Sequence, residues 1–332
     1  MKVLIIQTAF TGDVILATPL IEKLNQFYPQ AQIDFLLKKG NESLFHQHPI
    51  LNKVLIFNKK EGKIKQLFSL IKQIRAQQYD YVINLHRFFS SGLMAACSGA
   101  THKIGFDKNP FSFCYTFKKE HVIDEKSSFI HEIDRNLALI QHLTDHETVK
   151  PKLYPSKADF EQVKSKNPYV CIAPASVWFT KQFPVHKWVE LINLIPPHYT
   201  INLLGGPTDK GLCENIQSKS THGKVVVLAG ELSFLASAAL MQHAQMNFVN
   251  DSAPLHMASA TNAPVVGIFC STVPGFGFTP VADQSFIIET SEKLSCRPCG
   301  LHGYKACPES HFKCADLDVA GILSNVNLLR SC

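Results

Sequence analysis

Asn250, Asp251 and Ser252 stand between an apolar stretch and a segment with helical character in which Pro254 is an early residue. Proline is tolerated in the first turn of a helix, because an N–H group there has no partner within the helix. Asp251 or Ser252 would cap such a helix. Helix starts also attract anions, phosphate above all. The stretch therefore predicts either an ordinary helix cap or a phosphate site, and His256 is close enough along the helix to reach the same ligand.

A second group of polar side chains, Ser176, Thr180 and Lys181, lies in a loop between an apolar run and Pro184. An ammonium group can neutralise a phosphate, and hydroxyl groups can donate hydrogen bonds to its oxygens. A single lysine is more often a solvated surface residue. Because Lys181 and Asp251 both follow strands of one predicted sheet, we expect them at the same sheet edge, which favours the phosphate site.

Gly12 and Asp13 follow the first apolar run of the chain. Gly12 can adopt the backbone angles of a tight loop, and Asp13 stands at a predicted helix start. Asp13 is therefore either a helix cap or a carboxylate that serves as a general base. The chain contains neither a G-x-G-x-x-G motif nor a G-x-x-x-x-G-K-[ST] motif, so the sequence does not predict a conventional dinucleotide site or a P-loop.

These polar residues lie where predicted strands end. Short continuous apolar runs predict strands buried on both faces, and helical apolar spacing predicts the helices between them. The expected strands are 3–6, 33–37, 53–57, 81–85, 103–106, 169–173, 200–204, 225–228, 247–250 and 264–269. The expected helices are 14–27, 64–74, 129–143, 188–195, 209–217, 232–243 and 318–329. The alternation predicts an α/β protein of two doubly wound, Rossmann-like domains joined by a linker, with ligands at the carboxyl ends of the strands. If the two domains face each other, those ends meet across one cleft.

The composition of the 332 residues, 45% hydrophobic and 18% charged, is that of a soluble globular chain long enough for two domains. No apolar run approaches the length of a membrane span, and the first apolar run is too short for a signal peptide, so we expect a cytoplasmic protein. The net charge of +6 suits an acidic partner. The chain has no RNA-binding signature and no long basic run, so nucleic acid is not an expected partner.

Several short motifs follow one another along the chain in a characteristic order, and Gly12-Asp13 and the stretch 250–256 are the most specific of them. The motifs are Val3–Ile6, Gly12–Val14, Thr18-Pro19, Asn84–Arg87, Ile104–Phe106, Ser176–Lys181, Gly205–Pro207 and Asn250–His256. Together they resemble the ADP-heptose:lipopolysaccharide heptosyltransferases, glycosyltransferase family 9. The resemblance extends from the first strand to about residue 316.

This resemblance implies a GT-B fold, with an acceptor-binding domain over 1–155, a nucleotide-sugar-binding domain over 156–315 and a C-terminal helix over 316–332. It implies transfer of heptose from ADP-heptose to the inner core of lipopolysaccharide, with inversion of the anomeric centre and without a metal or other cofactor. The implied partners are the ADP-heptose donor and a lipid A-core acceptor, with peripheral contact at the inner membrane face.

The resemblance also implies roles for individual residues. Asp13 matches the catalytic base, and Lys181 matches the residue that steadies the donor phosphates. Two positions depart from the family pattern, since Gln7 stands where many relatives have a basic residue and Ala253 replaces a common glycine. The implied donor-binding residues are Ser176, Thr180, Lys181, Asp209, Leu232, Asp251, Ser252, Ala253 and His256.

Inverting sugar transfer needs a base that takes the acceptor hydroxyl proton while the bond to the diphosphate breaks. Negative charge grows on the leaving ADP, so fixed donors beside it stabilise the transition state. On the acceptor side we expect contacts from Gly12, His86 and Arg87. An acceptor rich in phosphate and carboxylate would be attracted to His86, Arg87 and Lys38-Lys39, although each of these also fits an ordinary solvated surface charge.

Four cysteines near the C-terminus, Cys296, Cys299, Cys307 and Cys314, have the spacing of a small structural cluster, although only the first two form a C-x-x-C pair. The sequence leaves three states open for these cysteines: reduced packed thiols, a structural zinc site or a disulfide. Two other functions also stay open: a GT-B glycosyltransferase with another sugar nucleotide or acceptor, and a non-catalytic nucleotide-sugar-binding protein.

Overall fold

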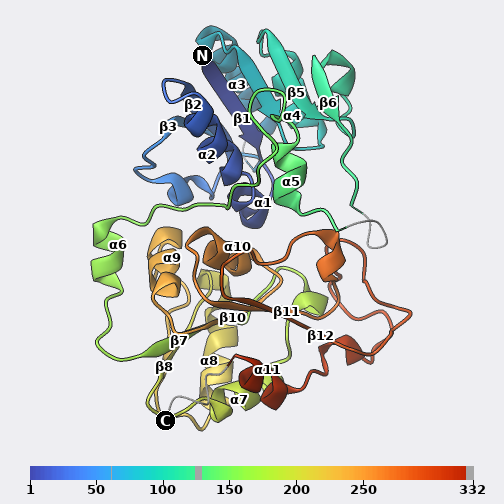
Figure 1. Ribbon diagram of the computed structural model, residues 1–332. Helices are drawn as coiled ribbons and strands as arrows, with labels where there is room; N and C mark the ends of the chain where they lie inside the picture. Colours follow the sequence, from blue (N-terminus) through green and yellow to red (C-terminus); the bar gives the residue numbers. More distant parts are fainter. Residues whose placement is uncertain (61, 124–128, 327–332) are drawn as a thin grey trace. The chain divides into compact units, whose positions relative to one another are not determined.

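The alternating strands and helices form two separate parallel sheets, shown in the ribbon diagram of the computed structural model (Figure 1). The structure describes residues 1–60, 62–123 and 129–326, and within these residues each sheet has six strands. The described residues divide into two compact units: unit 1 contains residues 1–60, 62–123 and 130–154, and unit 2 contains residue 129 and residues 155–326. The prediction of two doubly wound α/β domains is therefore confirmed.

Unit 1 has the strand order β3-β2-β1-β4-β5-β6, which reverses between β1 and β4. Its helices pack in two groups, α2 with α5 and α3 with α4. The strands are β1 (Lys2–Gln7), β2 (Gln32–Lys38), β3 (Leu51–Phe57), β4 (Tyr81–Asn84), β5 (His102–Phe106) and β6 (Phe117–Lys119). The helices are α1 (Thr11–Ile15), α2 (Thr18–Phe27), α3 (Lys63–Gln77), α4 (Phe89–Ala96) and α5 (Glu132–Leu137), with 3-10 turns η1 (Glu42–Phe45) and η2 (Ser112–Cys114).

Unit 2 repeats the same topology, with the order β12-β11-β10-β7-β8-β9 and a reversal between β7 and β10. Figure 1 shows α9 and α10 on one face of this sheet and α7, α8 and α11 on the other. The strands are β7 (Tyr169–Ala173), β8 (Thr200–Leu203), β9 (Val225–Val227), β10 (Asn247–Asn250), β11 (Val265–Phe269) and β12 (Ser285–Glu289). The helices are α6 (Lys157–Gln162), α7 (Val185–Leu194), α8 (Lys210–Lys219), α9 (Phe234–Gln242), α10 (Ala253–Ala260) and α11 (Val319–Asn325), with 3-10 turns η3 (Phe179–Lys181), η4 (Pro207–Asp209), η5 (Pro274–Phe276) and η6 (Lys313–Ala315).

The central strands are the most deeply buried elements. All side chains from Val3 to Ile6 in β1 and from Val170 to Ile172 in β7 are 0% exposed. A strand covered by helices on both faces needs apolar residues at every position, which explains the continuous apolar runs in the sequence. In unit 2 the core also contains Trp188 of α7, which is 0% exposed.

The helix expected over 14–27 is in fact two helices, α1 and α2, and Pro19 explains the break. Proline has no N–H group to donate to the carbonyl four residues earlier, which is that of Ile15. The hydroxyl of Thr18 donates to this carbonyl instead, at 2.7 Å, and Asn136 donates to the carbonyl of Leu16 at 3.2 Å. The chain therefore changes direction at 16–17 and starts a new helix.

Several other element boundaries differ from the prediction. The helix expected over 129–143 is α-helical only from Glu132 to Leu137, because the amides of Leu139, Ile140 and Leu143 donate to carbonyls three residues earlier and wind the chain more tightly. The last helix, expected over 318–329, runs from Val319 to Asn325, and 327–329 lie outside the described residues. The short elements α4, α6, β6 and β12 were not predicted.

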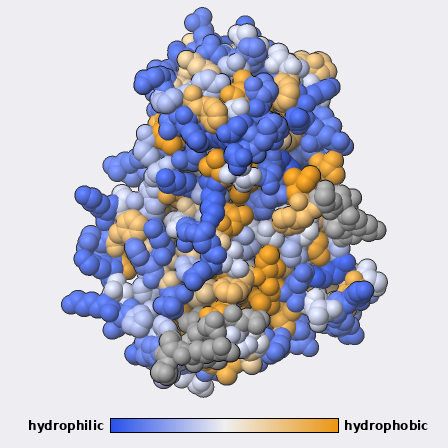
Figure 2. Space-filling model, in the orientation of Figure 1, coloured by the Kyte–Doolittle hydropathy of each residue, from blue (hydrophilic) through white to orange (hydrophobic). Residues whose placement is uncertain are grey.

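No helix in the described ranges combines the length and the hydropathy that a membrane-spanning helix requires. On the face shown in Figure 2, hydrophobic residues lie in patches between hydrophilic ones. Large exposed side chains in unit 1 include Phe10, Phe88, Phe89 and Phe113. The first three lie in loops or a helix start directly after β1 and β4, at the carboxyl edge of the unit 1 sheet.

Candidate functional site

The loop after β7 and the start of α10 meet at the point where the strand order of unit 2 reverses. Asn250, the last residue of β10, is 0% exposed and joins them. Its amide nitrogen donates to the carbonyl of Pro174 at 2.7 Å, and its amide oxygen accepts from the N–H of Phe183 at 3.0 Å. One side chain thus fixes both ends of the loop 174–183, which carries Ser176, Thr180 and Lys181.

Lys181 and Asp251, 70 positions apart in the sequence, form an ion pair in this loop cluster. The distance from Lys181 Nζ to Asp251 Oδ2 is 2.7 Å, and the two side chains are only 14% and 8% exposed. The same carboxylate oxygen accepts a hydrogen bond from the hydroxyl of Thr272 at 2.7 Å. The structure therefore brings together the two charged residues that the sequence placed at one sheet edge.

Helix α10 starts immediately beside this pair, with Ser252 as its N-cap residue. The Ser252 side chain does not cap the helix, since its hydroxyl points to the carbonyls of Ala175 and Asn250 at 3.5 and 3.4 Å. Ala253 and Pro254 form the first turn, and His256 lies within the helix at 5% exposure. Pro254 has no N–H group and the N–H of Leu255 donates to the Ser252 carbonyl at 3.0 Å, so the backbone N–H of Ala253 is the group of this turn that is suited to bind an anion.

Thr180 and Ser176 occupy different environments within the loop. Thr180 is 0% exposed, and its hydroxyl accepts from the N–H of Tyr304 at 2.8 Å and from the hydroxyl of Ser271 at 3.0 Å. Ser176 is partly exposed, and its carbonyl accepts from the Gln182 amide at 2.7 Å. Thr180 is therefore built into the support of the loop, while the hydroxyl of Ser176 lies nearer the surface.

Asp209 and Leu232 lie further along the same sheet edge, after β8 and β9. One carboxylate oxygen of Asp209 accepts from the N–H of Gly206 at 2.8 Å, which ties the residue to its own loop. The N–H of Gly230 donates to the carbonyl of Gly205 at 2.9 Å, so the loops after β8 and β9 contact each other. Leu232 is partly exposed beside them.

In unit 1, Asp13 lies in the first turn of α1, directly after β1. Its carboxylate accepts from the backbone N–H of Phe10 at 3.2 Å, and the residue is partly exposed, as is Gly12. At the end of the adjacent β4, the His86 ring nitrogen Nδ1 lies 2.9 Å from the hydroxyl of Thr8. Asp13, Gly12, His86 and Arg87 therefore follow the two strands between which the order of unit 1 reverses.

His86 and Arg87 differ in charge. His86 is 8% exposed, and burial, reinforced by the positive charges of Lys59 and Arg87, lowers its pKa to about 3. The imidazole is therefore neutral at physiological pH and acts through hydrogen bonds, not through charge. Arg87 is exposed, with its guanidinium 5.3 Å from the ring of Phe88.

Lys59, which sequence reasoning did not place in the site, follows β3 at the same edge. Its ammonium donates to the carbonyl of Thr8 at 2.7 Å. Burial, followed by the positive charges of Lys38 and Lys63, lowers the pKa of Lys59 to about 8. Within the part of the chain that the structure describes, Lys59, Lys38 and Arg87 form no ion pair with a carboxylate. The rule that singled out the other strand-end loops also applies to Lys59 and could have identified it.

The four C-terminal cysteines lie near one another in unit 2. Cys299 and Cys314 are buried, while Cys296 and Cys307 are partly buried. Burial, together with the neighbouring thiols, raises the pKa of Cys314 to about 11. Over residues 1–60, 62–123 and 129–326 the cysteines form no disulfide, and no group of three or more metal-ligating side chains is arranged to hold a metal.

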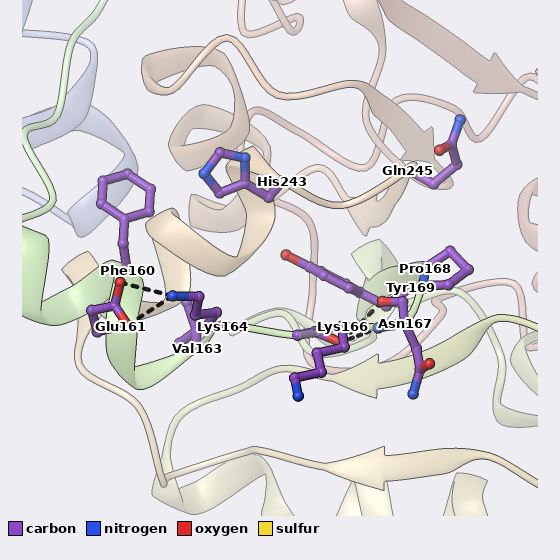
Figure 3. A pocket seen from close by; sticks show the side chains of 11 residues that line it. Phe160, Glu161, Val163, Lys164, Lys166, Asn167, Pro168, Tyr169, His243 and Gln245 are labelled. Atoms are coloured by element: carbon purple, nitrogen blue, oxygen red, sulfur yellow. Dashed lines mark hydrogen bonds and ion pairs between the residues drawn. The ribbon is translucent and has the colours of Figure 1, made fainter.

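A pocket of about 440 Å³ lies at the opposite end of β7 from these loops (Figure 3). Tyr169, the first residue of β7, lies in its wall, together with Phe160 of α6 and His243, which follows α9. None of its lining residues belongs to the expected donor or acceptor residues. The candidate site is therefore formed by the strand-end loops and not by this pocket.

Comparison with known proteins gives a consistent result. The model of glycosyltransferase family 9 (heptosyltransferase) matches residues 67–304. The chain is 30% identical over 287 residues to lipopolysaccharide heptosyltransferase 3 of Escherichia coli K12, with 79% of this chain and 80% of that protein covered.

Two solved structures are similar over nearly the whole chain. One is E. coli ADP-heptose lps heptosyltransferase II, with a TM-score of 0.82, 22% identity and 99% of each chain covered. The other is E. coli heptosyltransferase WaaC with ADP, with a TM-score of 0.75, 18% identity and coverage of 98% and 99%. At these identities the structural similarity establishes a shared fold.

Proposed function

The chain belongs to glycosyltransferase family 9, the heptosyltransferases, and from this premise we propose that it transfers heptose from ADP-heptose to the inner core of lipopolysaccharide. The relative that is 30% identical carries the name of a lipopolysaccharide heptosyltransferase. The solved structure with ADP supports an adenosine diphosphate donor. The observation that carries the proposal is the Lys181–Asp251 pair beside the uncapped start of α10.

Unit 2 binds the donor in this proposal. A diphosphate at the carboxyl edge of its sheet meets the ammonium of Lys181 and the backbone N–H of Ala253, the first residue of α10. As the bond from the anomeric carbon to the diphosphate oxygen breaks, negative charge grows on ADP, and both groups stabilise it. Lys181 and the helix start thus provide the charge stabilisation that a metal ion supplies in other transferases.

The remaining donor residues fall into two roles. Ser176 and Ser252 present hydroxyls near the diphosphate, and Ala253 brings the backbone of α10 close to it. Thr180 and Asp209 hold their loops, since the Thr180 hydroxyl is occupied within the protein and an Asp209 oxygen accepts from Gly206. The adenosine lies towards the loops after β8 and β9, where Leu232 is partly exposed, and His256 supports the turn from within α10.

Unit 1 binds the acceptor. The acceptor hydroxyl oxygen attacks the anomeric carbon from the face opposite the departing ADP, which inverts that centre, and Asp13 takes the hydroxyl proton. Arg87, Lys59 and Lys38 bind acidic groups of the acceptor, because no described carboxylate neutralises them. His86, which is neutral, shapes this edge through Thr8.

An acceptor anchored in lipid A also brings the protein to the inner membrane face. Contact there is peripheral in this proposal, with the exposed Phe10, Phe88 and Phe89 beside the cationic edge of unit 1. Aromatic and basic side chains together favour an anionic lipid surface.

The decisive experiment incubates the purified protein with ADP-heptose and a series of truncated lipopolysaccharide core acceptors, followed by mass analysis of the product. We expect the acceptor mass to increase by one heptose residue, with and without EDTA, and the product linkage to be inverted. Thermal shifts with ADP, UDP and GDP test the nucleotide, and we expect stabilisation by ADP. No transfer to any core acceptor, or stabilisation by UDP or GDP and not by ADP, would refute the proposal.

A further inference from the structure

Thr272 lies in the loop after β11, outside the motifs that indicated the donor site, yet it contacts that site directly. Its hydroxyl donates to Asp251 Oδ2 at 2.7 Å, the same oxygen that lies 2.7 Å from Lys181 Nζ. Thr272 is 1% exposed, so water does not reach this hydroxyl. A buried carboxylate held from a second direction keeps one orientation, and the lysine paired with it is held as well.

The loop that carries Thr272 is itself fixed by Arg297. The guanidinium donates to the carbonyls of Cys270 at 2.7 Å, Thr272 at 2.6 Å and Phe269 at 3.2 Å. It also pairs with the carboxylate of Glu289 at 2.7 Å. Arginine has a rigid fork of donors, so four oxygens around one guanidinium define the path of the backbone closely. The position of the Thr272 hydroxyl is therefore set by Arg297, which lies between Cys296 and Cys299.

The loop 174–183, which carries Lys181, is supported at a second point, by Ser271 of the loop after β11 and by residues 303–304. Ser271 donates to the Thr180 hydroxyl, which also accepts from the N–H of Tyr304. Gly303 has φ +79°, and a Cβ there would lie 2.9 Å from Thr180 Oγ1 and 3.0 Å from Lys181 Cγ. A side chain at 303 would thus displace the loop, which shows how closely Gly303 abuts Lys181.

We propose that Thr272 is a positioning residue for the donor: through Asp251 it holds the ammonium of Lys181 in the direction from which it meets the diphosphate. Arg297 acts one step further back, by fixing the loop from which Thr272 reaches Asp251. The inference rests on the proposed function of unit 2 as the donor-binding unit. It adds to that function a residue that contacts neither substrate and acts only through the Lys181–Asp251 pair.

The test compares Thr272→Val, which keeps the shape and removes the hydroxyl, with Thr272→Ser, which keeps the hydroxyl. The loss of one hydrogen bond to a charged group predicts an increase of about tenfold in the KM for ADP-heptose and in the Kd for ADP in the valine variant. The serine variant should stay within about twofold of the wild type. The acceptor KM should not change in either variant, because the acceptor contacts lie in unit 1. Thr261→Val, which removes a hydroxyl at the far end of α10, is the matched control and should leave the donor KM unchanged.

Two results would overturn the inference: a valine variant with wild-type donor KM, or a serine variant as impaired as the valine variant, which would assign the effect to packing. If the valine variant does not fold, Thr272→Ala replaces it in the same comparison with serine. A wild-type protein that binds no ADP by calorimetry would instead refute the proposed donor site, and the role of Thr272 with it.

Discussion

Replacement of Lys181 by methionine tests whether the ion pair at the donor site is a buried charge pair. The change leaves the Asp251 carboxylate, 8% exposed, with the Thr272 hydroxyl as its partner. Removal of one partner from a buried pair costs about 3–5 kcal/mol, because the remaining charge stays desolvated. Lys181 is 14% exposed, so some water can approach the vacated position. We therefore expect the lower end, a loss of about 3 kcal/mol in the unfolding free energy of unit 2.

The double variant Lys181→Met/Asp251→Asn separates stability from function. Asparagine has nearly the shape of aspartate and no charge, so the desolvation cost disappears and unfolding should return to within about 1 kcal/mol of the wild type. Transfer should not return, since the ammonium that meets the diphosphate is still missing. We expect kcat/KM to fall by a factor of about 10²–10³ in both variants, the range for loss of one charge-stabilising donor.

Tryptophan fluorescence during urea unfolding measures this effect in unit 2 alone. The chain has two tryptophans, Trp178 and Trp188, and both lie in unit 2. Trp178 stands in the altered loop, so the series is made in a Trp178→Phe background, in which only Trp188, 0% exposed, reports. If Lys181→Met in this background is as stable as Trp178→Phe alone, the pair does not behave as a buried charge pair and the reasoning is refuted. A double variant with parental turnover would refute the role of Lys181.

Three further predictions follow from the site. Asp13→Asn should lower kcat by a factor of about 10²–10⁴, the range for loss of a general base, and leave the Kd for ADP unchanged; near-normal turnover would exclude the base role. The pKa of Lys59 is about 8 in the free protein, so its charge is present below pH 8 and lost above it. The KM for a phosphorylated core acceptor should therefore rise between pH 7 and 9 in the wild type, and be higher but flat in Lys59→Met; parallel curves would contradict this. Asn250→Ala leaves the Pro174 carbonyl and the Phe183 N–H without their partner, which should destabilise unit 2 by about 3 kcal/mol in the same fluorescence assay; an unchanged midpoint would show that water or a shifted loop replaces both bonds.

The sequence was sufficient for the central strands of both sheets and for the loops that follow them, but not for the edge strands β6 and β12. Runs such as Val3–Ile6 are apolar at every position, and a strand of that kind fits only the middle of a parallel sheet. Once the sheet is parallel, every strand ends at the same edge, so polar residues after strands converge without further information. The convergence of Lys181 and Asp251 followed from this geometry alone.

Contacts between residues that lie far apart along the chain could not be predicted from the sequence. The break between α1 and α2 depends on the Thr18 hydroxyl as well as on Pro19, and a hydroxyl beside a proline has many other possible partners. The hydroxyl of Thr180, expected at the donor phosphates, accepts from the backbone N–H of Tyr304, 124 positions later, and this contact could not be predicted from the loop itself. The neutral state of His86 likewise depends on burial and on Lys59, and neither is visible in the motif around it.

The two units share one topology, and in the proposed function the charges at their reversal points suit it to two kinds of ligand. In unit 2 the central cation, Lys181, is already paired with Asp251, so its charge is held in place before a diphosphate arrives. In unit 1 the cations of Lys38, Lys59 and Arg87 have no described carboxylate partner, and the mutual repulsion of the lysines is part of what lowers the pKa of Lys59. Binding of an anion relieves such repulsion. A fixed donor site requires orientation more than net charge, whereas an acceptor that carries several acidic groups supplies the neutralising charge itself. In the proposed function, the same strand order therefore serves a positioned diphosphate in unit 2 and a polyanionic acceptor in unit 1.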